Sequence, residues 1–324
     1  MSYFDSVKRD PWTTEQDYHA STAAKEAEFA NPDINALLTD PLRDARHNLG
    51  LSRDRAYMAL ELAIQRYSGG DPLEMVDTYV DYAFIQFQRH FDAYPATDAL
   101  LRPWVRDDYQ YIVWLLTLAV LLGYPQQVEQ LPCWINHDDE RSHDVLLHRL
   151  FDRVGQTYPG ETLIHPQPYK PLLEALDLRH DEQQQALFQY LNEWYDGSQN
   201  CYWHGRHHRP RGDHFGYWAF EAALVVLLWK IDDTSLRNAF HYPKALIDNA
   251  RDRNLGDVYP DEETRAWRRP PMFASGALCP WPGLYVCVER MVGEHPFMHD
   301  MPFPKIDGEV VHWKLSNTFD SSSR

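Results

Sequence analysis

The sequence predicts an all-α protein of two packed helical halves, each with a buried central helix, followed by an irregular C-terminal extension with a short β-hairpin. Three observations predict this. Apolar residues recur three or four positions apart through most of the first 254 residues, which is the spacing of an amphipathic helix. Segments 109–123 and 217–229 are apolar on nearly every side, as buried central helices are. Prolines and aromatic residues crowd into the chain after Leu255.

The chain is expected to divide where its composition changes. Segment 155–171 (GQTYPGETLIHPQPYKP) holds four prolines and two glycines, so it is the best candidate for a boundary. The expected parts are an N-terminal lead (1–50), an N-terminal helical domain (51–154), a Pro-rich linker (155–171), a C-terminal helical domain (172–254) and the C-terminal extension (255–324).

Helix signals follow one another through the first half. A helix over 54–67 is expected to end at Gly69-Gly70, because glycine commonly terminates helices. Asp71-Pro72 then supplies a cap and a first-turn proline for a helix over 73–91. Asp107-Asp108 precedes the first central helix, where acidic side chains suit the positive end of the helix dipole.

The second half repeats this plan and then changes character. One or two helices are expected over 172–195, the second central helix over 217–229 and a short helix over 244–252. In the extension, LYVCV (284–288) and EVVHWKL (309–315) have β-type composition. These two segments account for the expected hairpin, and the extension is expected to pack against the helical body.

The net charge of the chain limits the kinds of partner it can bind. The chain has 324 residues and a formal net charge of −17. Binding to a nucleic-acid backbone or to an anionic membrane surface needs clustered Lys and Arg, so neither partner is expected. The partners that remain possible are a small molecule, a neutral surface and a basic protein.

Cysteine usage and the N-terminus indicate the compartment. Four cysteines (Cys133, Cys201, Cys279 and Cys287) are too few for a disulfide scaffold in a chain of this length. The first residues, MSYFDSVKRDPW, contain no apolar signal region. Neither apolar run reaches the roughly 20 residues that span a bilayer. A reduced cytoplasmic protein is therefore expected.

Metal binding is weakly supported. The loop at 202–216 holds His204, His207, His208 and His214, but three arginines lie among them and would repel a cation, so a basic loop or partner contact is favoured. A second set consists of Cys279, Cys287, His295 and His299. Seven residues lie between its cysteines, whereas the paired cysteines of a zinc site usually have two to four residues between them. No metal and no cofactor are expected.

His-Asp dipeptides offer an alternative function. They occur at His137-Asp138, His143-Asp144, His180-Asp181 and His299-Asp300. In a helical protein such pairs can belong to a metal-dependent hydrolase, although 16 histidines make one or two pairs expected by chance. This hydrolase is the alternative to a binding protein without catalysis.

The remaining candidate functional residues are acidic. Glu221 stands alone on the apolar segment 217–229, where burial would raise the pKa of its carboxyl group unless other groups satisfy it. Asp232-Asp233 follows as a capping turn. Two acidic clusters, Asp138-Asp139-Glu140 and Asp261-Glu262-Glu263, fall in expected loops, where they could attract a basic partner.

Two stretches resemble the PoNi family of immunity proteins. ALELAIQRYSGGDPLEMV followed by YQYIVWLLTLAVLLGYP is similar to the N-terminal half of that family, and LNEWYD followed by GYWAFEAALVVLLWKIDDTSLRNAFHYPKALIDNAR is similar to the C-terminal half. The resemblance covers roughly residues 55–250. The motif residues that carry it, expected to be structural, are Tyr217, Trp218, Glu221, Asp232, Asp233, Tyr242 and Pro243. Segment 276–315 is also similar to a tail of polymorphic-toxin immunity proteins.

The resemblance implies a function. Proteins of this family are helical, cytoplasmic and without catalytic residues, and they protect a bacterium from a sibling's toxin, commonly a DNase delivered by type VI secretion. The implied partner is a cognate toxin domain, a basic nuclease, bound one to one. The two acidic clusters (Asp138, Asp139, Glu140 and Asp261, Glu262, Glu263) are the expected toxin contacts. A secretion-system adaptor with several partners is a third reading.

Overall fold

The computed structural model describes residues 2–39, 44–209, 214–259, 272–279, 283–287, 294–298 and 300–318. Two compact units, Met1–Pro260 and Asp261–Arg324, are described separately below. The first unit is helical, as predicted. Its α-helices are α1 (Tyr3–Val7), α2 (Glu15–Ala30), α3 (Pro32–Thr39), α4 (Ala45–Gly69), α5 (Leu73–Ala93), α6 (Arg106–Leu122), α7 (Pro125–Gln130), α8 (Val145–Arg153), α9 (Pro166–Ala175), α10 (His180–Gly197), α11 (Phe220–Leu228) and α12 (Lys244–Asp252).

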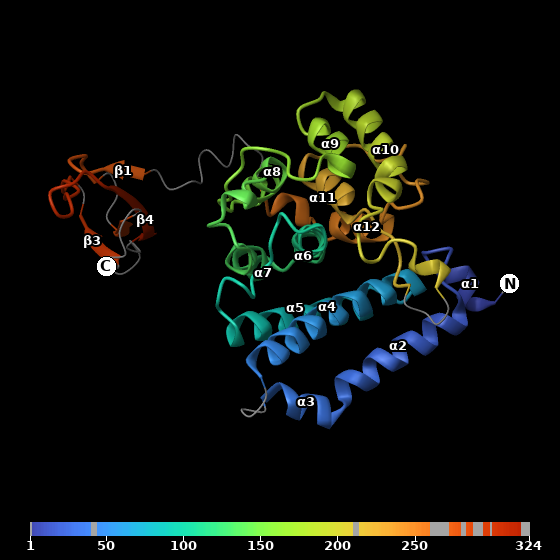
Figure 1. Cartoon of the computed structure of the whole chain (residues 1–324). Coiled ribbons are helices and arrows are strands. Elements are labelled where there is room, and N and C mark those ends of the chain that lie inside the picture. The colour runs from blue at the N-terminus through green and yellow to red at the C-terminus, as the bar shows by residue number, and fades with distance from the viewer. Residues whose placement is uncertain are drawn as a thin grey trace, which may run out of the picture. The chain divides into compact units, whose positions relative to one another are not determined.

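Helices α4 and α5 pack along each other and are joined at Gly70 (Figure 1). Gly70 caps α4 with φ of 92°, and a Cβ there would lie 2.2 Å from the carbonyl oxygen of Val7. The predicted glycine stop is confirmed: α4 ends at Gly69, two residues after Tyr67, where the apolar pattern ends. Glycine is required here both by the left-handed backbone and by the close approach of the N-terminal segment.

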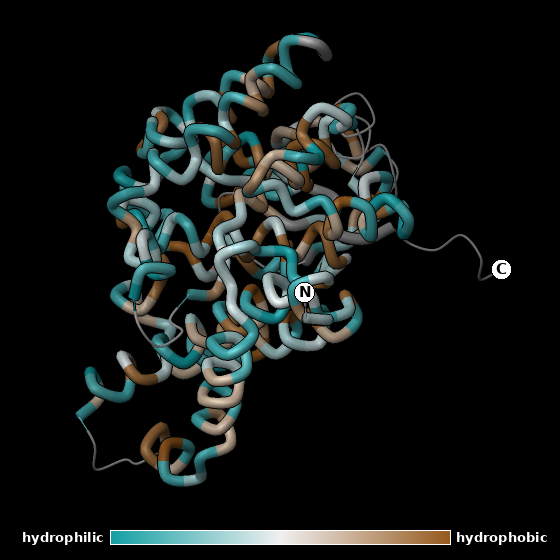
Figure 2. The backbone as a smooth tube through the Cα atoms, turned by 90° about the vertical axis from the view of Figure 1, so that its right-hand side faces the viewer, coloured by the Kyte–Doolittle hydropathy of each residue, from teal (hydrophilic) through white to brown (hydrophobic). Residues whose placement is uncertain are grey.

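The two predicted central helices meet in one core. Every residue of α6 from Asp108 to Leu122 is buried, and so is every residue of α11. Helix α6 contacts both α11 and α12, so the two halves share one continuous hydrophobic core. Figure 2 shows brown, apolar turns in the interior of this unit. Burial on all sides explains why neither sequence shows an amphipathic pattern.

The N-terminal residues belong to this helical unit. Asp10 is 2% exposed, and its Oδ2 lies 2.6 Å from Nε2 of His214. Arg66 on α4 forms ion pairs with Glu26 of α2 and with Asp71. The N-terminal segment 1–50 is therefore attached to the rest of the helical unit by polar contacts. A pattern of apolar residues does not predict such contacts.

Removal of the α2 cap tests this attachment. The Thr14 hydroxyl accepts a hydrogen bond from the Asp17 amide at 3.2 Å. Thr14→Ala should lower the free energy of unfolding by about 1 kcal/mol, because an N-terminal donor loses its acceptor. Urea denaturation followed by circular dichroism measures this, with Thr14→Ser as the control that keeps a hydroxyl. Equal losses in both variants would show that the cap does not stabilise α2.

The Pro-rich segment 155–171 lies inside the same unit rather than between two. Tyr158 is buried and donates to the carbonyl of Ser142 at 3.0 Å. Tyr169 is buried and donates to Oε1 of Gln110 on α6 at 2.9 Å. Pro159 lies in irregular backbone, Pro166 and Pro168 lie in the first turn of α9, and Pro171 lies inside α9. The abundance of proline therefore does not mark a boundary between two units here.

The second unit forms a four-stranded antiparallel sheet. Its strands are β1 (Met272–Ala274), β2 (Gly283–Cys287), β3 (Glu294–Phe297) and β4 (His312–Thr318), in the order β1-β4-β2-β3. The two segments with β-type composition form β2 and β4, which pair with each other. Strand β2 also pairs with β3 on its other edge. The part expected to be mostly irregular is therefore a sheet with its own small core, which includes Tyr285, Phe303 and Trp313.

Candidate functional site

Glu221 lies at the centre of the helical unit and is fully buried. Tyr190 and Trp194, one turn apart on α10, both donate to its Oε1, the indole nitrogen at 2.7 Å. No described residue donates a hydrogen bond to its Oε2. Burial raises the pKa of this carboxyl group to about 7, although the hydrogen bonds from Tyr190 and Trp194 oppose the shift. One carboxylate oxygen of Glu221 thus has hydrogen-bond donors, and the pKa of the group is still raised.

The two adjacent aspartates after α11 have different environments. Asp233 is buried and accepts hydrogen bonds from Tyr242, Arg237 and Arg251 at 2.8, 3.1 and 2.7 Å. Asp232 is exposed and accepts from the amide and hydroxyl of Thr234 at 3.1 and 2.6 Å. The predicted capping turn describes Asp232, whereas Asp233 joins three segments of the fold.

The other motif residues also lie in the interior. The indole of Trp218 donates to the hydroxyl of Ser68 at 2.8 Å, and Tyr217 accepts a hydrogen bond from the amide of His207 at 3.1 Å. Pro243 precedes α12, next to Tyr242. The motif residues thus connect segments of the helical unit. A surface that could contact a partner must therefore lie elsewhere.

The acidic loop, defined as Asp138, Asp139 and Glu140, lies on the surface between two buried anchors. Trp134 and Ile135 precede it, and Ser142 and Asp144 follow it, all at most 1% exposed. The carboxyl group of Asp144 binds the amides of Leu147 and Ile164 at 2.9 and 2.8 Å and the Tyr109 hydroxyl at 3.0 Å. These contacts hold both ends of the loop in place.

Within the acidic loop, only part of the charge is available to a partner. Arg141 binds Asp139 through two hydrogen bonds of 2.9 and 2.6 Å, and these hydrogen bonds lower the pKa of Asp139 to about 2. The Asp138 side chain is 87% exposed, and its one ion pair with a described residue is with His137, at 3.8 Å. Glu140 is exposed and forms no ion pair with any described residue. Asp138 and Glu140 therefore present the net negative charge.

The second cluster, Asp261-Glu262-Glu263, lies outside the described residues. Asp107-Asp108 is partly withdrawn from solvent: Asp107 accepts from the amide of Tyr202 at 3.0 Å, and Asp108 accepts from Arg102 Nε at 3.1 Å. The acidic loop is thus the described cluster that a partner can reach.

The histidines of the 202–216 loop pack against aromatic rings or a carboxylate. His204 stacks on Tyr195 at 4.2 Å, His207 stacks on Trp12 at 4.6 Å, and His214 pairs with Asp10. Burial lowers the pKa of His204 and of His207. The loop thus attaches the N-terminal segment to the second half.

Metal-ligating residues are dispersed in the described structure. Where side chains are described, no three His, Cys, Asp or Glu residues form a group that could hold a metal ion. In the His-Asp pairs, His143 binds Glu161 at 3.3 Å while Asp144 caps α8. The side chains of His180-Asp181 and the residue His299 lie outside the description. Cys279 contacts the Tyr285 hydroxyl at 3.5 Å, and His295 is exposed.

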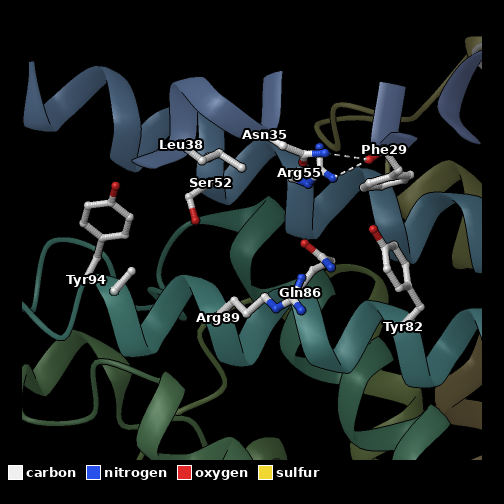
Figure 3. Close-up of a pocket in the computed structure, with 10 residues that line it drawn as sticks. Phe29, Asn35, Leu38, Ser52, Arg55, Tyr82, Gln86, Arg89 and Tyr94 are labelled. Atoms are coloured by element: carbon white, nitrogen blue, oxygen red, sulfur yellow. Dashed lines mark hydrogen bonds between the residues drawn. The ribbon is translucent and has the colours of Figure 1, made fainter. Parts of the chain in front are cut away.

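A pocket that the sequence did not indicate lies between α3, α4 and α5 (Figure 3). Its volume is about 530 Å³. Arg55 and Gln86 line it, although each occupies a buried position on its helix. A polar side chain flanked by buried apolar neighbours, Arg55 beside Ala56 and Gln86 beside Phe87, was the signal that could have revealed it.

None of the described helices combines the length and apolar character needed to cross a membrane. Comparison with family models gives two matches in chain order. The N-terminal model of the PoNe immunity proteins (PoNi) matches residues 9–133, and the C-terminal model matches residues 142–246. A comparison with curated proteins gives no match.

Among solved structures, the chain is similar to the crystal structure of protein PA2201 from Pseudomonas aeruginosa. The TM-score is 0.59 and the sequence identity is 20%, over 76% of this chain and 92% of that chain. At this identity the likeness shows a shared fold.

Proposed function

This chain belongs to the PoNi family of immunity proteins, and from that premise we propose that it neutralises its cognate toxin by direct one-to-one binding in the cytoplasm. The toxin is proposed to be a DNase delivered by type VI secretion. The match of both family models, in order and over most of the helical unit, is the observation that carries the proposal. Binding without catalysis is sufficient for this task.

The charge of the chain supports a basic partner. A nuclease presents a positively charged cleft to DNA, and a protein with a formal charge of −17 attracts such a surface. We infer that Asp138 and Glu140 lie near that cleft in the complex, with Asp139 held by Arg141. Because the loop is anchored at both ends, little conformational entropy is lost when it binds. Asp261, Glu262 and Glu263 remain candidates of the same kind.

Titration of the toxin tests the function directly. The toxin domain encoded beside this gene is purified, and plasmid degradation is followed with increasing amounts of this protein. The expected result is loss of degradation at one equivalent and a stable complex on a sizing column. Inhibition of a different toxic activity would keep the immunity function and exclude the DNase. Absence of both binding and inhibition would exclude this toxin as the partner.

Charge reversal tests the role of the acidic loop. The double variant Asp138→Lys with Glu140→Lys should slow association with the toxin by about tenfold at low salt, because steering depends on exposed, uncompensated charge. Stopped-flow kinetics at several salt concentrations measure this rate. The wild-type rate should fall steeply as salt rises.

The matched control removes a compensated pair from the same loop. Asp139→Ala with Arg141→Ala takes away one negative and one positive charge, so the association rate should change little. If this control slows association as much as the double lysine variant does, loop structure rather than net charge governs binding. A rate that does not depend on salt would exclude steering.

A further inference from the structure

The pocket between α3, α4 and α5 contains a buried cation. Arg55 is 7% exposed, and its Nη2 donates to the carbonyl oxygen of Phe29 at 2.9 Å. Its guanidinium group lies over the Phe29 ring at 4.8 Å from the centroid. Nη1 is buried and has no hydrogen-bond acceptor among the described residues. Within the described chain Arg55 forms no ion pair, although a buried charge without a counter-ion costs several kcal/mol.

Two further donors lie across the pocket. The side-chain amide nitrogen of Gln86 is buried and finds no acceptor in the described part of the chain, and Gln86 itself is 5% exposed. Figure 3 shows Gln86 and Arg89 side by side on α5, across the pocket from Arg55 on α4. Arg89, unlike Gln86, is exposed. None of the described residues that line the pocket is an aspartate or a glutamate. In a chain of charge −17, the described lining of this pocket thus holds two arginines and no carboxylate.

Such a donor set fits a carboxylate. A guanidinium group binds a carboxylate through parallel N–H donors, and charge-assisted hydrogen bonds of this kind are stronger than neutral ones. The rings of Phe29 and Tyr82 pack edge to face on one side of the pocket, 5.2 Å apart between centroids, and Leu38 adds an apolar side chain from α3. Asn35 and Ser52 are polar members of the same wall. A volume of about 530 Å³ lies in the range of small-molecule sites.

We propose that this pocket binds a small organic carboxylate with an apolar body, whose carboxylate is held by Arg55, Gln86 and Arg89. This ligand would be bound in addition to the toxin. The size and burial of the pocket favour a free small molecule over an acidic side chain of the toxin, because Arg55 and Gln86 lie almost entirely below the surface.

The test uses the full chain and 4-iodobenzoate as the probe. Isothermal titration calorimetry should show saturable binding of 4-iodobenzoate, and 4-iodobenzamide, which has the same shape without the charge, should bind at least about tenfold more weakly. Crystals soaked with 4-iodobenzoate should show anomalous iodine signal between α3 and α5. Absence of 4-iodobenzoate binding, or equal binding of the amide, overturns the proposal.

Variants locate the interaction. Arg55→Met should weaken 4-iodobenzoate binding by at least about tenfold, since a charged hydrogen bond is lost. Without ligand its melting temperature should not fall, because an apolar side chain replaces an unpaired buried charge. Arg179→Met, which changes an exposed arginine before α10, is the matched control and should bind as the wild type does.

Two outcomes remain decisive if Arg55→Met does not fold. Gln86→Leu and Arg89→Gln should then each weaken binding, and unchanged affinity in both overturns the proposal. If 4-iodobenzoate does not bind while these variants weaken the toxin complex, the pocket receives an acidic side chain of the toxin, and the small-molecule proposal is wrong. Inhibition of the toxin by the wild type is measured separately, so the two proposals can fail independently.

Discussion

Replacement of Asp233 by alanine is expected to lower the free energy of unfolding by about 3 kcal/mol. Breaking a buried ion pair by removing one partner costs about 3–5 kcal/mol. The lower value applies because Arg237 and Arg251 are 35% and 38% exposed and can reach water, and because Arg237 also binds Asp248 at 2.6 Å. The Tyr242 hydroxyl, in contrast, is buried and loses its acceptor.

The measurement is urea denaturation of the wild type and of two neighbouring variants. Asp232→Ala is the matched control, since it removes the same group one position earlier from an exposed turn. It should cost no more than about 1 kcal/mol, the usual value of a local cap. Similar losses in both variants would mean that Asp233 does not hold Tyr242, Arg237 and Arg251 together.

The helical body could be predicted from sequence because its signals are local. Apolar spacing and glycine stops are properties of neighbouring residues, so α4 and α5 were recognised. Helix α11 was predicted over 217–229 but begins at Phe220, because residues before it pair outside the helix: the Ala219 amide donates to the carbonyl of His241 at 3.0 Å. A contact between such distant residues leaves no periodic signal.

The polar attachments could not be predicted for the same reason. The pairing of Asp10 with His214 spans most of the helical unit, and nothing near either residue indicates the other. The sheet of the second unit also depends on distant pairing, because β4 lies between β1 and β2. Composition identified β2 and β4 but neither β1, β3 nor the order of the strands.

The candidate sites divide in a similar way. The acidic loop was visible as a charge run, but only the structure shows that Arg141 compensates Asp139. Glu221 was visible as a lone acid on an apolar segment, whereas its partners Tyr190 and Trp194 come from another helix. The proposed ligand site depends on Arg55 having no described acidic residue beside it. The sequence does not show which residues surround Arg55 in the fold, so this could not be predicted.

The pKa of Glu221 makes stability depend on pH in a predictable direction. Burial raises this pKa from an ordinary 4.5 to about 7. Below both values the group is protonated in the folded and in the unfolded chain. Between them only the unfolded chain releases the proton, so the contribution of Glu221 to stability falls as pH rises and reaches its minimum above pH 7. The fall amounts to about 3 kcal/mol for a shift of this size.

Glu221→Gln should therefore gain stability relative to the wild type as pH rises. The difference between their free energies of unfolding should increase by about 2.5 kcal/mol from about pH 5 to about pH 8, because glutamine keeps an acceptor for Tyr190 and Trp194 but does not ionise. Comparing the two proteins at each pH cancels the opposite contribution of His90 and His165, whose pKa values burial lowers to about 4.

Two further variants establish that the effect belongs to the buried carboxyl group. Glu193→Gln changes an exposed glutamate on α10, one position before Trp194, and its difference from the wild type should not vary with pH. Tyr190→Phe removes a hydrogen bond that favours the ionised form of Glu221, so the fall in stability should extend to higher pH. A pH-independent difference for Glu221→Gln would mean that Glu221 ionises in the folded protein at its ordinary pKa, and hence that Tyr190, Trp194 and nearby water together offset its desolvation.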